Sequence, residues 1–244
     1  MGGARNALVT GAAGGMGRAI CKALVDAGHS VVLADRDRGA VEAFAKELGT
    51  KSVPLVLDIT DANATAGLLD AIPAAFKPID ILVNNAGHDI GGRTPFAEGL
   101  ADDWAAIVET NLIGLMRVTR AILPVMVERN SGDIVNMSSI NALRIIPDMA
   151  PYSASKAGVH MFTETLRGEL TETNVRVVEL NPGLTKTNII LTRYRGDKKK
   201  EKAYFDQFKM AMAPEDIARS IMFAINEPRH VQIAQIVILP VNRY

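Results

Sequence analysis

Apolar residues along the chain follow two periods, and the two alternate regularly. Short, nearly continuous apolar runs rich in branched side chains are typical of strands that are buried on both faces. Between them lie longer segments in which apolar residues recur every three to four positions, as Val41, Phe44 and Leu48 do, and this period predicts amphipathic helices. Strands are predicted in this way at residues 7–10, 30–34, 52–57, 79–83, 133–137, 175–180 and 231–239.

The alternation of strand and helix decides the fold class. Strands that are apolar throughout need helices on both faces, and strands separated by helices run parallel within one sheet. We therefore predict an α/β fold with a doubly wound, Rossmann-type sheet of seven parallel strands. The sequence shows no internal repeat, low-complexity tract or interdomain linker, and 244 residues suit one large core. Residues 1–244 are predicted to form a single domain.

Charge and composition exclude several classes of partner. Lysine plus arginine and aspartate plus glutamate both total 27, so the formal net charge is zero. This balance gives no reason to expect a nucleic acid or an anionic membrane surface as a partner. The basic run at residues 198–200 is short and flanked by acids, and we expect it to be a solvated helix face.

Three features bear on the compartment. Cys21 is the only cysteine, so an intrachain disulfide is excluded, and it lies on the apolar side of a predicted helix as a small buried hydrophobe would. The chain begins almost directly with a strand and lacks the apolar region of a signal peptide. By sequence, no apolar stretch approaches the ~18 residues needed to span a bilayer. We expect a cytoplasmic protein.

A glycine-rich turn follows the first predicted strand and leads into a helix. Its sequence, GAAGGMG at residues 11–17, differs in spacing from the common G-x-G-x-x-G. Glycines permit unusual backbone angles and let a pyrophosphate approach the amides at a helix N-terminus, although they also serve plain strand–helix turns. The position between first strand and helix is the context that a dinucleotide site requires. The candidate cofactor-binding residues here are Gly11, Gly14, Gly15, Met16 and Gly17.

Charged residues at the ends of the second and third strands extend this candidate site. Asp35 lies where a carboxylate would accept hydrogen bonds from an adenosine ribose diol. Arg36 follows at once, and an arginine in this region could instead hold a 2′-phosphate. Asp58, followed by Ile59, could contact adenine or simply cap the helix that begins near Asp61.

Small residues and amides end the fourth strand. The segment with Asn85, Ala86 and Gly87 suits a strand end beside a cofactor, though as a turn it would be unremarkable. His88 and Asp89 come next, without a second histidine or a cysteine at ligand spacing. We therefore expect a polar loop there and no metal site.

A polar residue interrupts the apolar stripe of the helix that begins near residue 101. The stripe includes Trp104, Ile107, Leu115 and Val118, and Asn111 falls on the same face. Because a buried polar group must find partners, Asn111 is either bonded to neighbouring backbone or takes part in the chemistry.

Three further residues form the candidate catalytic group. Ser139 follows the fifth strand, at the edge where open parallel sheets place their ligands. Tyr152 and Lys156 stand four apart in a predicted helix at residues 151–173, so they share one helical face. An ammonium close to a phenol favours the phenolate and lowers the phenol's pKa from its usual value near 10. The pair is therefore a candidate general acid/base in which Lys156 adjusts the pKa of Tyr152. The same spacing is also common on solvated helix faces.

In this order, the motifs resemble those of the short-chain dehydrogenase/reductase family over essentially the whole chain. The matching features are Thr10-Gly-x-x-x-Gly15-x-Gly17, Asn84-Asn-Ala-Gly87, the helical Asn111, Ser139 thirteen residues before Tyr152, Tyr152-x-x-x-Lys156 and Asn181-Pro-Gly183. The last third looks like the branch that acts on small 3-hydroxy acids such as serine, some of whose members reduce sulfonated aldehydes. The segments that carry this finer resemblance are residues 182–185, 193–197 and 239–241.

The resemblance implies reversible hydride transfer between a nicotinamide cofactor and a small hydroxyl or carbonyl substrate. Ser139 would hydrogen-bond the substrate oxygen, and Tyr152 would exchange the proton. Lys156 would lower the pKa of Tyr152 and bind the nicotinamide ribose, and Asn111 would support a water-linked proton path. The turn and the residues after it would also hold the cofactor, through Pro182, Gly183, Thr185 and Thr187. A strand order of 3-2-1-4-5-6-7 and a homotetramer are implied as well.

Two alternatives use the same fold. One is a nicotinamide-sensing or scaffold protein without turnover, and the other is a dehydrogenase for a neutral secondary alcohol. Fold alone does not separate them. A sensor could lose any of the four candidate catalytic residues, yet all four are present. An epimerase or dehydratase of the extended branch would need a further substrate domain, for which the chain is too short.

The cofactor is predicted to be NAD. The branch is generally linked to NADP, but this chain has Asp35 where a 2′-phosphate would have to go, and no basic residue just before Gly15. Like charges in contact cost several kcal/mol. Arg36 could offset part of that cost.

An anionic substrate is expected from the arginines near the site. Residues 188–210 interrupt the alternation and are predicted to form a substrate lid that carries Arg193. The planar fork of an arginine matches a carboxylate or a sulfonate. We expect Arg144, or failing that a lid arginine, to hold such a group while the substrate oxygen contacts Ser139 and Tyr152. In the alternative, these arginines are solvated or pair with local acids such as Asp148 and Asp197.

Overall fold

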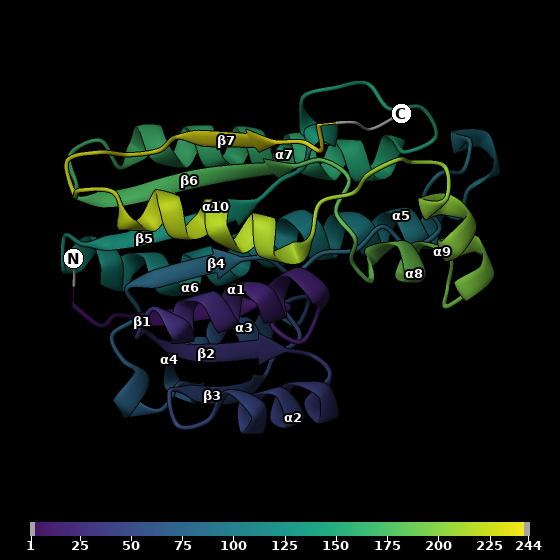
Figure 1. Cartoon of the computed structure of the whole chain (residues 1–244). Helices are drawn as coiled ribbons and strands as arrows, with labels where there is room; N and C mark the ends of the chain where they lie inside the picture. The colour runs from purple at the N-terminus through teal and green to yellow at the C-terminus, as the bar shows by residue number, and fades with distance from the viewer. Residues whose placement is uncertain (1–2, 242–244) are drawn as a thin grey trace.

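Parallel strands with apolar side chains on both faces form the centre of the protein. The computed structural model describes residues 3–241, and in that range the sheet has seven strands, all paired in parallel (Figure 1). Their order across the sheet is β3-β2-β1-β4-β5-β6-β7, so the predicted fold class and strand order are confirmed. The strands are β1 (Asn6–Thr10), β2 (Ser30–Asp35), β3 (Ser52–Val56), β4 (Ile81–Asn84), β5 (Gly132–Met137), β6 (Val175–Pro182) and β7 (Gln235–Ile238).

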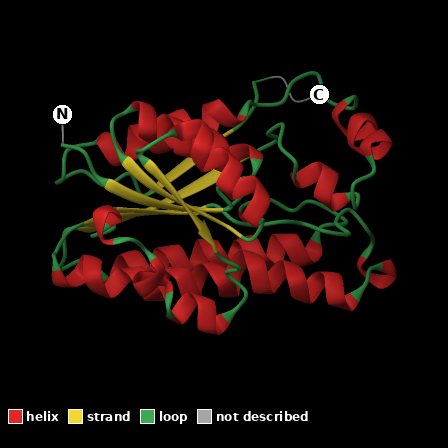
Figure 2. Cartoon of the chain, turned by 90° about the horizontal axis from the view of Figure 1, so that it is seen from below, coloured by secondary structure: helices red, strands yellow, loops and turns green. Residues whose placement is uncertain are grey.

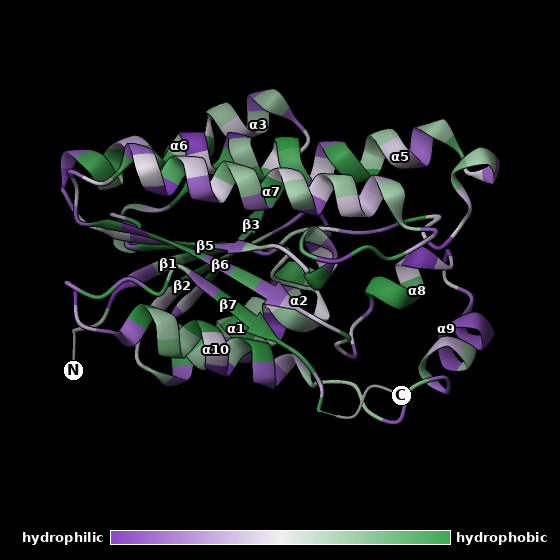
Figure 3. Ribbon diagram, turned by 90° about the horizontal axis from the view of Figure 1, so that it is seen from above, coloured by the Kyte–Doolittle hydropathy of each residue, from purple (hydrophilic) through white to green (hydrophobic). Residues whose placement is uncertain are grey.

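Helices cover both faces of the sheet in two layers (Figures 2 and 3). One layer holds α1 (Gly15–Asp26), α2 (Arg38–Leu48) and α10 (Pro214–Asn226). The other holds α3 (Ala62–Ala66), α5 (Ala101–Val108), α6 (Leu115–Glu128) and α7 (Ala150–Glu169), and α4 (Leu68–Ala71) packs against α6 in the same layer. Two short helices, α8 (Ile189–Arg193) and α9 (Lys198–Phe205), lie beyond the carboxyl ends of the strands. Short 3₁₀ turns occur at Ala74–Phe76, Phe96–Glu98 and Ile140–Ala142.

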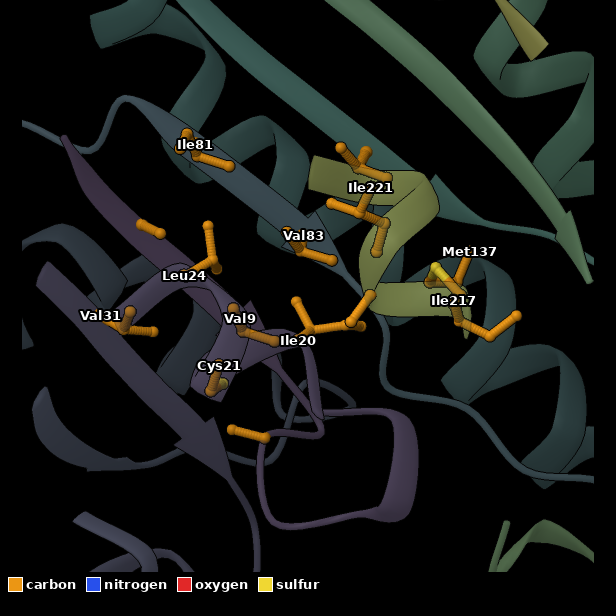
Figure 4. Packing of buried hydrophobic residues seen from close by; sticks show 14 of the residues in the cluster. Val9, Ile20, Cys21, Leu24, Val31, Ile81, Val83, Met137, Ile217 and Ile221 are labelled. Atoms are coloured by element: carbon orange, nitrogen blue, oxygen red, sulfur yellow. The ribbon is translucent and has the colours of Figure 1, made fainter. Parts of the chain in front are cut away.

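The core has two halves because successive side chains of a strand point to opposite faces. Val9 packs with α1 and α10, through Ile20, Leu24 and Ile221 among others (Figure 4). Leu8, its neighbour in β1, belongs to the cluster on the other face. Cys21 lies in the first cluster as expected, and burial raises the pKa of its thiol.

The last strand and one helix differ from the sequence prediction. β7 begins at Gln235 rather than residue 231, because residues 228–231 form a turn in which the Val231 amide donates to the Pro228 carbonyl. The helix α7 ends at Glu169, and the Leu170 amide closes its last turn on the carbonyls of Leu166 and Arg167. The chain through residue 173 therefore lies outside the helix.

The helices α5 and α6 are continuous through a π-helical segment, η3 (Glu109–Gly114). Together they span Ala101–Glu128, which among the described residues is the one helix long and apolar enough to cross a membrane by length and composition. The sequence-based expectation that no stretch reaches this length is therefore wrong. In this fold Ile107, Val118 and Ile122 are buried, and a helix that covers a sheet is apolar for the same reason as one that spans a bilayer.

Charged side chains tie the sheet together at the amino ends of its strands. Asp133, at the start of β5, is 1% exposed and accepts hydrogen bonds from three arginines. The nitrogen–oxygen distances are 2.6 Å from Arg5, 2.7 Å from Arg176 and 3.0 Å from Arg229. Arg5 and Arg176 also donate to the Ile225 carbonyl at the end of α10. This cluster fixes β1, β5, β6 and α10 at the end of the sheet opposite the candidate site.

We predict that Asp133→Asn lowers the free energy of unfolding by about 3–5 kcal/mol, because the buried Arg176 and two partly exposed arginines lose their buried counterion. Urea unfolding at neutral pH measures the change. As a control, Asp206→Asn removes only an exposed pair with Lys202 and should cost no more than about 1 kcal/mol. Equal effects of the two substitutions would show that the cluster does not hold the sheet together.

Candidate active site

The glycine-rich turn brings the start of α1 into direct contact with the end of β1. Gly11 has a φ of +64°, and a Cβ on it would lie 2.9 Å from the Ala86 Cα. A Cβ on Gly17 would lie 2.0 Å from the Gly11 carbonyl oxygen, so no larger residue fits there. Gly14 is the N-cap of α1, and within residues 3–241 no side chain caps this helix. The first amides of α1 therefore face an open space that suits an anion.

A cleft over the carboxyl ends of β1 to β4 gathers the predicted cofactor-binding residues. The sequence places them on five separate segments, and the fold joins these segments along one edge of the sheet (Figure 1). The cleft is lined by Gly11, Gly14, Gly15, Met16, Gly17, Asp35, Arg36, Asp58, Ile59, Asn85, Ala86, Gly87 and Thr187.

The acids along this cleft have distinct tasks. Asp35 accepts hydrogen bonds from the amides of Ala13 and Asp37, both at 3.0 Å, one on each carboxylate oxygen. Asp58 accepts from the amide and the hydroxyl of Thr60, and these bonds lower the pKa of its carboxyl. Asp61 caps α3, so the alternative that Asp58 caps this helix is excluded. Arg36 is exposed beside these acids.

Hydrogen bonds join the turn after β4 to the turn after β1. The side-chain amide of Asn85 donates to the carbonyls of Thr10 (2.9 Å) and Gly11 (3.1 Å). In return, the Thr10 hydroxyl accepts from the amides of Asn85 (3.0 Å) and Ala86 (3.1 Å). The two turns form one rigid wall of the cleft.

Asn111 lies within the π-helical segment and is fully buried. Its Oδ1 accepts from the His88 amide at 2.9 Å, and its Nδ2 donates to the His88 carbonyl at 2.9 Å and to the Ser155 hydroxyl at 3.1 Å. Asn111 thus bonds to neighbouring backbone, and it also lies at the site, because a Cβ on Gly87 would come within 2.9 Å of its Oδ1 and 3.6 Å of the Lys156 Nζ.

Lys156 reaches the site from α7 with its ammonium buried. Nζ donates to the Met137 carbonyl at 2.8 Å and lies 5.8 Å from the centre of the Tyr152 ring. Burial lowers the pKa of Lys156 to about 8, against the opposing effect of the Asp89 carboxylate. The half-buried Tyr152 and the buried Lys156 therefore share one face of α7, and the alternative of a solvated helix face does not hold.

The pKa of Tyr152 moves in the direction opposite to the sequence-based expectation. Burial of the hydroxyl raises it, and the Asp89 carboxylate adds to the rise. A hydrogen bond with Ser139 and the charge of Arg193 lower it by less. Because Nζ of Lys156 is directed to the Met137 carbonyl, the lysine does not offset burial in this structure.

A second cavity adjoins the cleft and contains the candidate catalytic hydroxyls. Its volume is about 100 Å³, which suits a small substrate. The Ser139 hydroxyl, held by the amide of Asn141 at 3.2 Å, lies in it. Arg144 is exposed and is not part of its wall. The predicted residues that line this cavity are Ser139, Tyr152, Pro182, Gly183, Thr185, Thr187 and Arg193.

Two residues in this region have roles that sequence reasoning missed. Asp89 was expected in a polar loop, but it is fully buried and pairs with Arg193, 104 residues further along the chain. Arg193 therefore does not pair with Asp197, which caps α9 instead. Tyr204 of α9 also lines the cavity, beside Arg193. No local pattern marks contacts between segments so far apart.

A group of possible metal ligands lies elsewhere in the described chain, at His160, Glu164 and Glu179. His160 lies 2.8 Å from a Glu179 carboxylate oxygen, and Gln235 donates to the same oxygen at 2.7 Å. Glu164 pairs with Arg167. This group touches neither the cleft nor the cavity.

Comparison with known proteins agrees with this geometry. A family model described as "short chain dehydrogenase" matches residues 5–197. The chain belongs to the short-chain dehydrogenase family. It is therefore an oxidoreductase that transfers a hydride between a nicotinamide cofactor and a small hydroxyl or carbonyl substrate.

Similar members of the family cover nearly the whole chain. A probable NADP-dependent dehydrogenase of Haemophilus influenzae is 37% identical, over 96% of this chain and 92% of its own length. An NADP-dependent 3-hydroxy acid dehydrogenase of Schizosaccharomyces pombe is 34% identical, over 96% and 91%. The closed form of a serine dehydrogenase, solved with NADP⁺, is 36% identical, with a TM-score of 0.92 over 96% and 94%.

The residues present fit a nicotinamide dinucleotide. The glycine turn leaves space where side chains would block a pyrophosphate, and Asp35 retains oxygen lone pairs for hydroxyl groups at the far end of the cleft. Thr187 lines both the cleft and the cavity, so it lies where cofactor and substrate would meet. When bound, the nicotinamide supplies the acceptor or donor of the hydride.

Two glycine substitutions should separate stability from cofactor binding. Gly17→Ala forces a Cβ against the Gly11 carbonyl and should lower the free energy of unfolding by about 1–3 kcal/mol. A Cβ on Gly15 meets Thr187 only at 3.5 Å, so Gly15→Ala should change stability by less than about 0.5 kcal/mol while weakening cofactor binding. Urea unfolding without cofactor and fluorescence titration with cofactor measure the two effects. An unchanged cofactor affinity in Gly15→Ala would argue against the assigned path of the pyrophosphate.

Proposed function

We propose that this short-chain dehydrogenase catalyses the reversible oxidation of a small hydroxy acid. The observation that carries the proposal is the cavity in which Ser139 and Tyr152 face Arg193, directly beside the dinucleotide cleft. The names of similar proteins, a 3-hydroxy acid dehydrogenase and a serine dehydrogenase, support this substrate class. A sensor without turnover and an enzyme for neutral alcohols are less consistent with these relatives.

The chemistry follows from the positions of the side chains. Ser139 donates a hydrogen bond to the substrate oxygen and holds it near the phenol. Tyr152 donates its proton to a carbonyl substrate, or, once deprotonated to the phenolate, accepts the proton of an alcohol in the reverse direction. Because burial raises its pKa, Tyr152 is protonated at neutral pH in the free protein and can donate without a prior step. The family resemblance gives Lys156 the role of stabilising the phenolate left after donation, and this role requires its Nζ to turn from the Met137 carbonyl toward the phenol.

Asn111 does not line the cavity but positions the elements that carry the catalytic side chains. It joins the His88 backbone to the Ser155 hydroxyl, so it holds the turn after β4 against α7, on which Tyr152 and Lys156 lie. A water-linked proton path from Lys156 past Asn111 completes the proposal, as the family resemblance implies.

Tyr152→Phe should lower kcat by ~10²–10⁴, the usual contribution of a positioned acid/base, while cofactor affinity stays within about threefold. The phenyl ring keeps the packing and removes only the hydroxyl. Steady-state assays that follow the absorbance of the reduced nicotinamide, together with cofactor titration, test this outcome. A variant that kept most of its turnover would remove Tyr152 from the mechanism and favour the sensor alternative.

We further propose that NAD is preferred over NADP, unlike the similar proteins whose names specify NADP. Asp35 supports this preference, because its carboxylate is fixed by two backbone amides at the end of β2 and cannot turn away from a 2′-phosphate without losing them. Arg36 is exposed, so its attraction for a 2′-phosphate is screened by solvent.

Asp35→Ser should invert or abolish the preference, because it removes the like charge and leaves Arg36 in place. We expect NADP to bind at least tenfold more tightly to the variant than to the parent, and NAD to bind more weakly. Titration of both oxidised cofactors against both proteins provides the measurement, and Asp37→Asn, which affects only the cap of α2, serves as the control. Equal or tighter binding of NADP by the parent would show that Arg36 decides the specificity.

Other features of the proposal continue the expectations of the sequence analysis, and the tetramer among them rests on the family resemblance. Residues 188–210, with α8 and α9, would act as a lid over the cavity that Arg193 and Tyr204 line, within one domain of residues 1–244. A homotetramer would use the helices that carry Asn111 and Tyr152, which have an apolar hollow between Met116 and Phe162. A cytoplasmic location agrees with the single, buried cysteine.

A further inference from the structure

A buried ion pair joins the lid to the loop after β4. Asp89 is fully buried and Arg193 is 6% exposed. Both contacts of the guanidinium go to one carboxylate oxygen, Oδ2, with Nε at 2.8 Å and Nη2 at 2.5 Å. The backbone adds a second link, in which the Gly91 amide donates to the Arg193 carbonyl at 3.2 Å. The pair therefore has a fixed geometry.

The pair is incompletely bonded. Nη1 of Arg193 and Oδ1 of Asp89 are both buried, and neither has a hydrogen-bond partner within residues 3–241. A buried donor or acceptor without a partner costs free energy, so it calls for an explanation. The face of the guanidinium lies 4.8 Å from the centre of the Tyr204 ring, which leaves its edge as the place where a further acceptor could bind.

Arg193 forms part of the wall of the substrate cavity. Arg193 lines this cavity together with Ser139 and Tyr152, whereas Asp89 does not and so stands behind the arginine. A small substrate whose hydroxyl lies at Ser139 and Tyr152 would therefore have its other end at Arg193. A carboxylate or sulfonate at that end supplies the missing acceptor.

We propose that Arg193 and Asp89 form the subsite for the anionic group of the substrate, in which Asp89 is a built-in counterion that competes with the substrate for Arg193. The proposal rests on the proposed function and names the groups that select its substrate class. Arg193 contacts the anion, and Asp89 is a positioning residue that also limits the affinity. Neutralisation of Asp89 is then expected to strengthen anion binding rather than weaken it.

The charges around Asp89 set the sign of a pH effect. Arg193 faces it from α8, and Lys156 and Tyr152 face it from α7. Burial raises the pKa of Asp89 to about 6, whereas the Asp89 carboxylate keeps Arg193 charged throughout. As pH falls through 6, Asp89 loses its charge and the KM of an anionic substrate should fall. Lys156 titrates at a higher pH, with a pKa of about 8, so the change around pH 6 belongs to Asp89.

The test compares 3-hydroxypropanoate with its methyl ester, because the two differ chiefly in the negative charge. In Asp89→Asn we expect the KM of the acid at pH 8 to fall at least ~5-fold, while the KM of the ester stays within about threefold. The ratio of the two KM values should also lose its dependence on pH around 6. A purely structural Asp89 predicts the opposite, namely that both substrates bind more weakly.

Arg193→Gln should raise the KM of the acid by about 10- to 100-fold with little change in kcat, and leave the ester nearly unaffected. Because Arg193→Gln leaves the buried Asp89 carboxylate without a partner, the double variant Asp89→Asn, Arg193→Gln serves as a second test. It should show the same rise in the KM of the acid and the same unaffected ester. Arg219→Gln, which removes an exposed arginine on α10, is the matched control and should change neither substrate. If the variants lost acid and ester alike, or the acid were insensitive to Arg193, the subsite would be wrong.

A binding readout separates this inference from the proposed function. Thermal shift with 3-hydroxypropanoate in the presence of saturating oxidised cofactor reports the anion subsite without turnover. We expect stabilisation of the parent protein, stronger stabilisation of Asp89→Asn and none of Arg193→Gln. The proposed function fails alone if neither substrate is turned over although this pattern holds. The inference fails alone if both substrates react but the three proteins respond equally to the acid.

Discussion

The sheet changes direction between β1 and β4, and the site depends on how the ends of these two neighbouring strands are held. From β1 the chain proceeds outward through β2 to β3, and after β4 it proceeds the other way through β5 to β7. A crevice forms at such a point because the connections leave in opposite directions. Four hydrogen bonds between Thr10, Gly11 and the segment of Asn85 and Ala86 close the floor of this crevice. They fix the relative position of the glycine turn and of the turn that Asn111 supports.

Stability and function are separated along the strands. At their amino ends, Asp133 binds three arginines, which also donate to backbone carbonyls. At their carboxyl ends, Arg193 and Asp89 retain unpartnered atoms, and Lys156 has a lowered pKa. Within the described residues, the buried side-chain atoms of this arginine cluster all have partners, whereas Arg193 and Asp89 have atoms with which a bound molecule could form hydrogen bonds.

Local patterns in the sequence were sufficient for most of the fold and for the cofactor cleft. Strand order followed from the family resemblance, and the glycine turn, Asp35 and Asn85 could be assigned because each directly follows a strand. The pairing of Asp89 with Arg193 could not be predicted, because it joins segments 104 residues apart. The raised pKa of Tyr152 was also missed, since it reflects burial by several elements and not the spacing to Lys156.

The division of the two cavities along the chain has a consequence for how such an enzyme can diversify. The cofactor cleft is built chiefly from residues before 111, whereas the substrate cavity is built chiefly from residues after 137. Changes in the second half of the chain can therefore alter the substrate while the dinucleotide cleft keeps its shape. Met16, Thr187 and Ile189 line both spaces and form their common border. These three positions are the ones at which a change of substrate cannot be made independently of the cofactor.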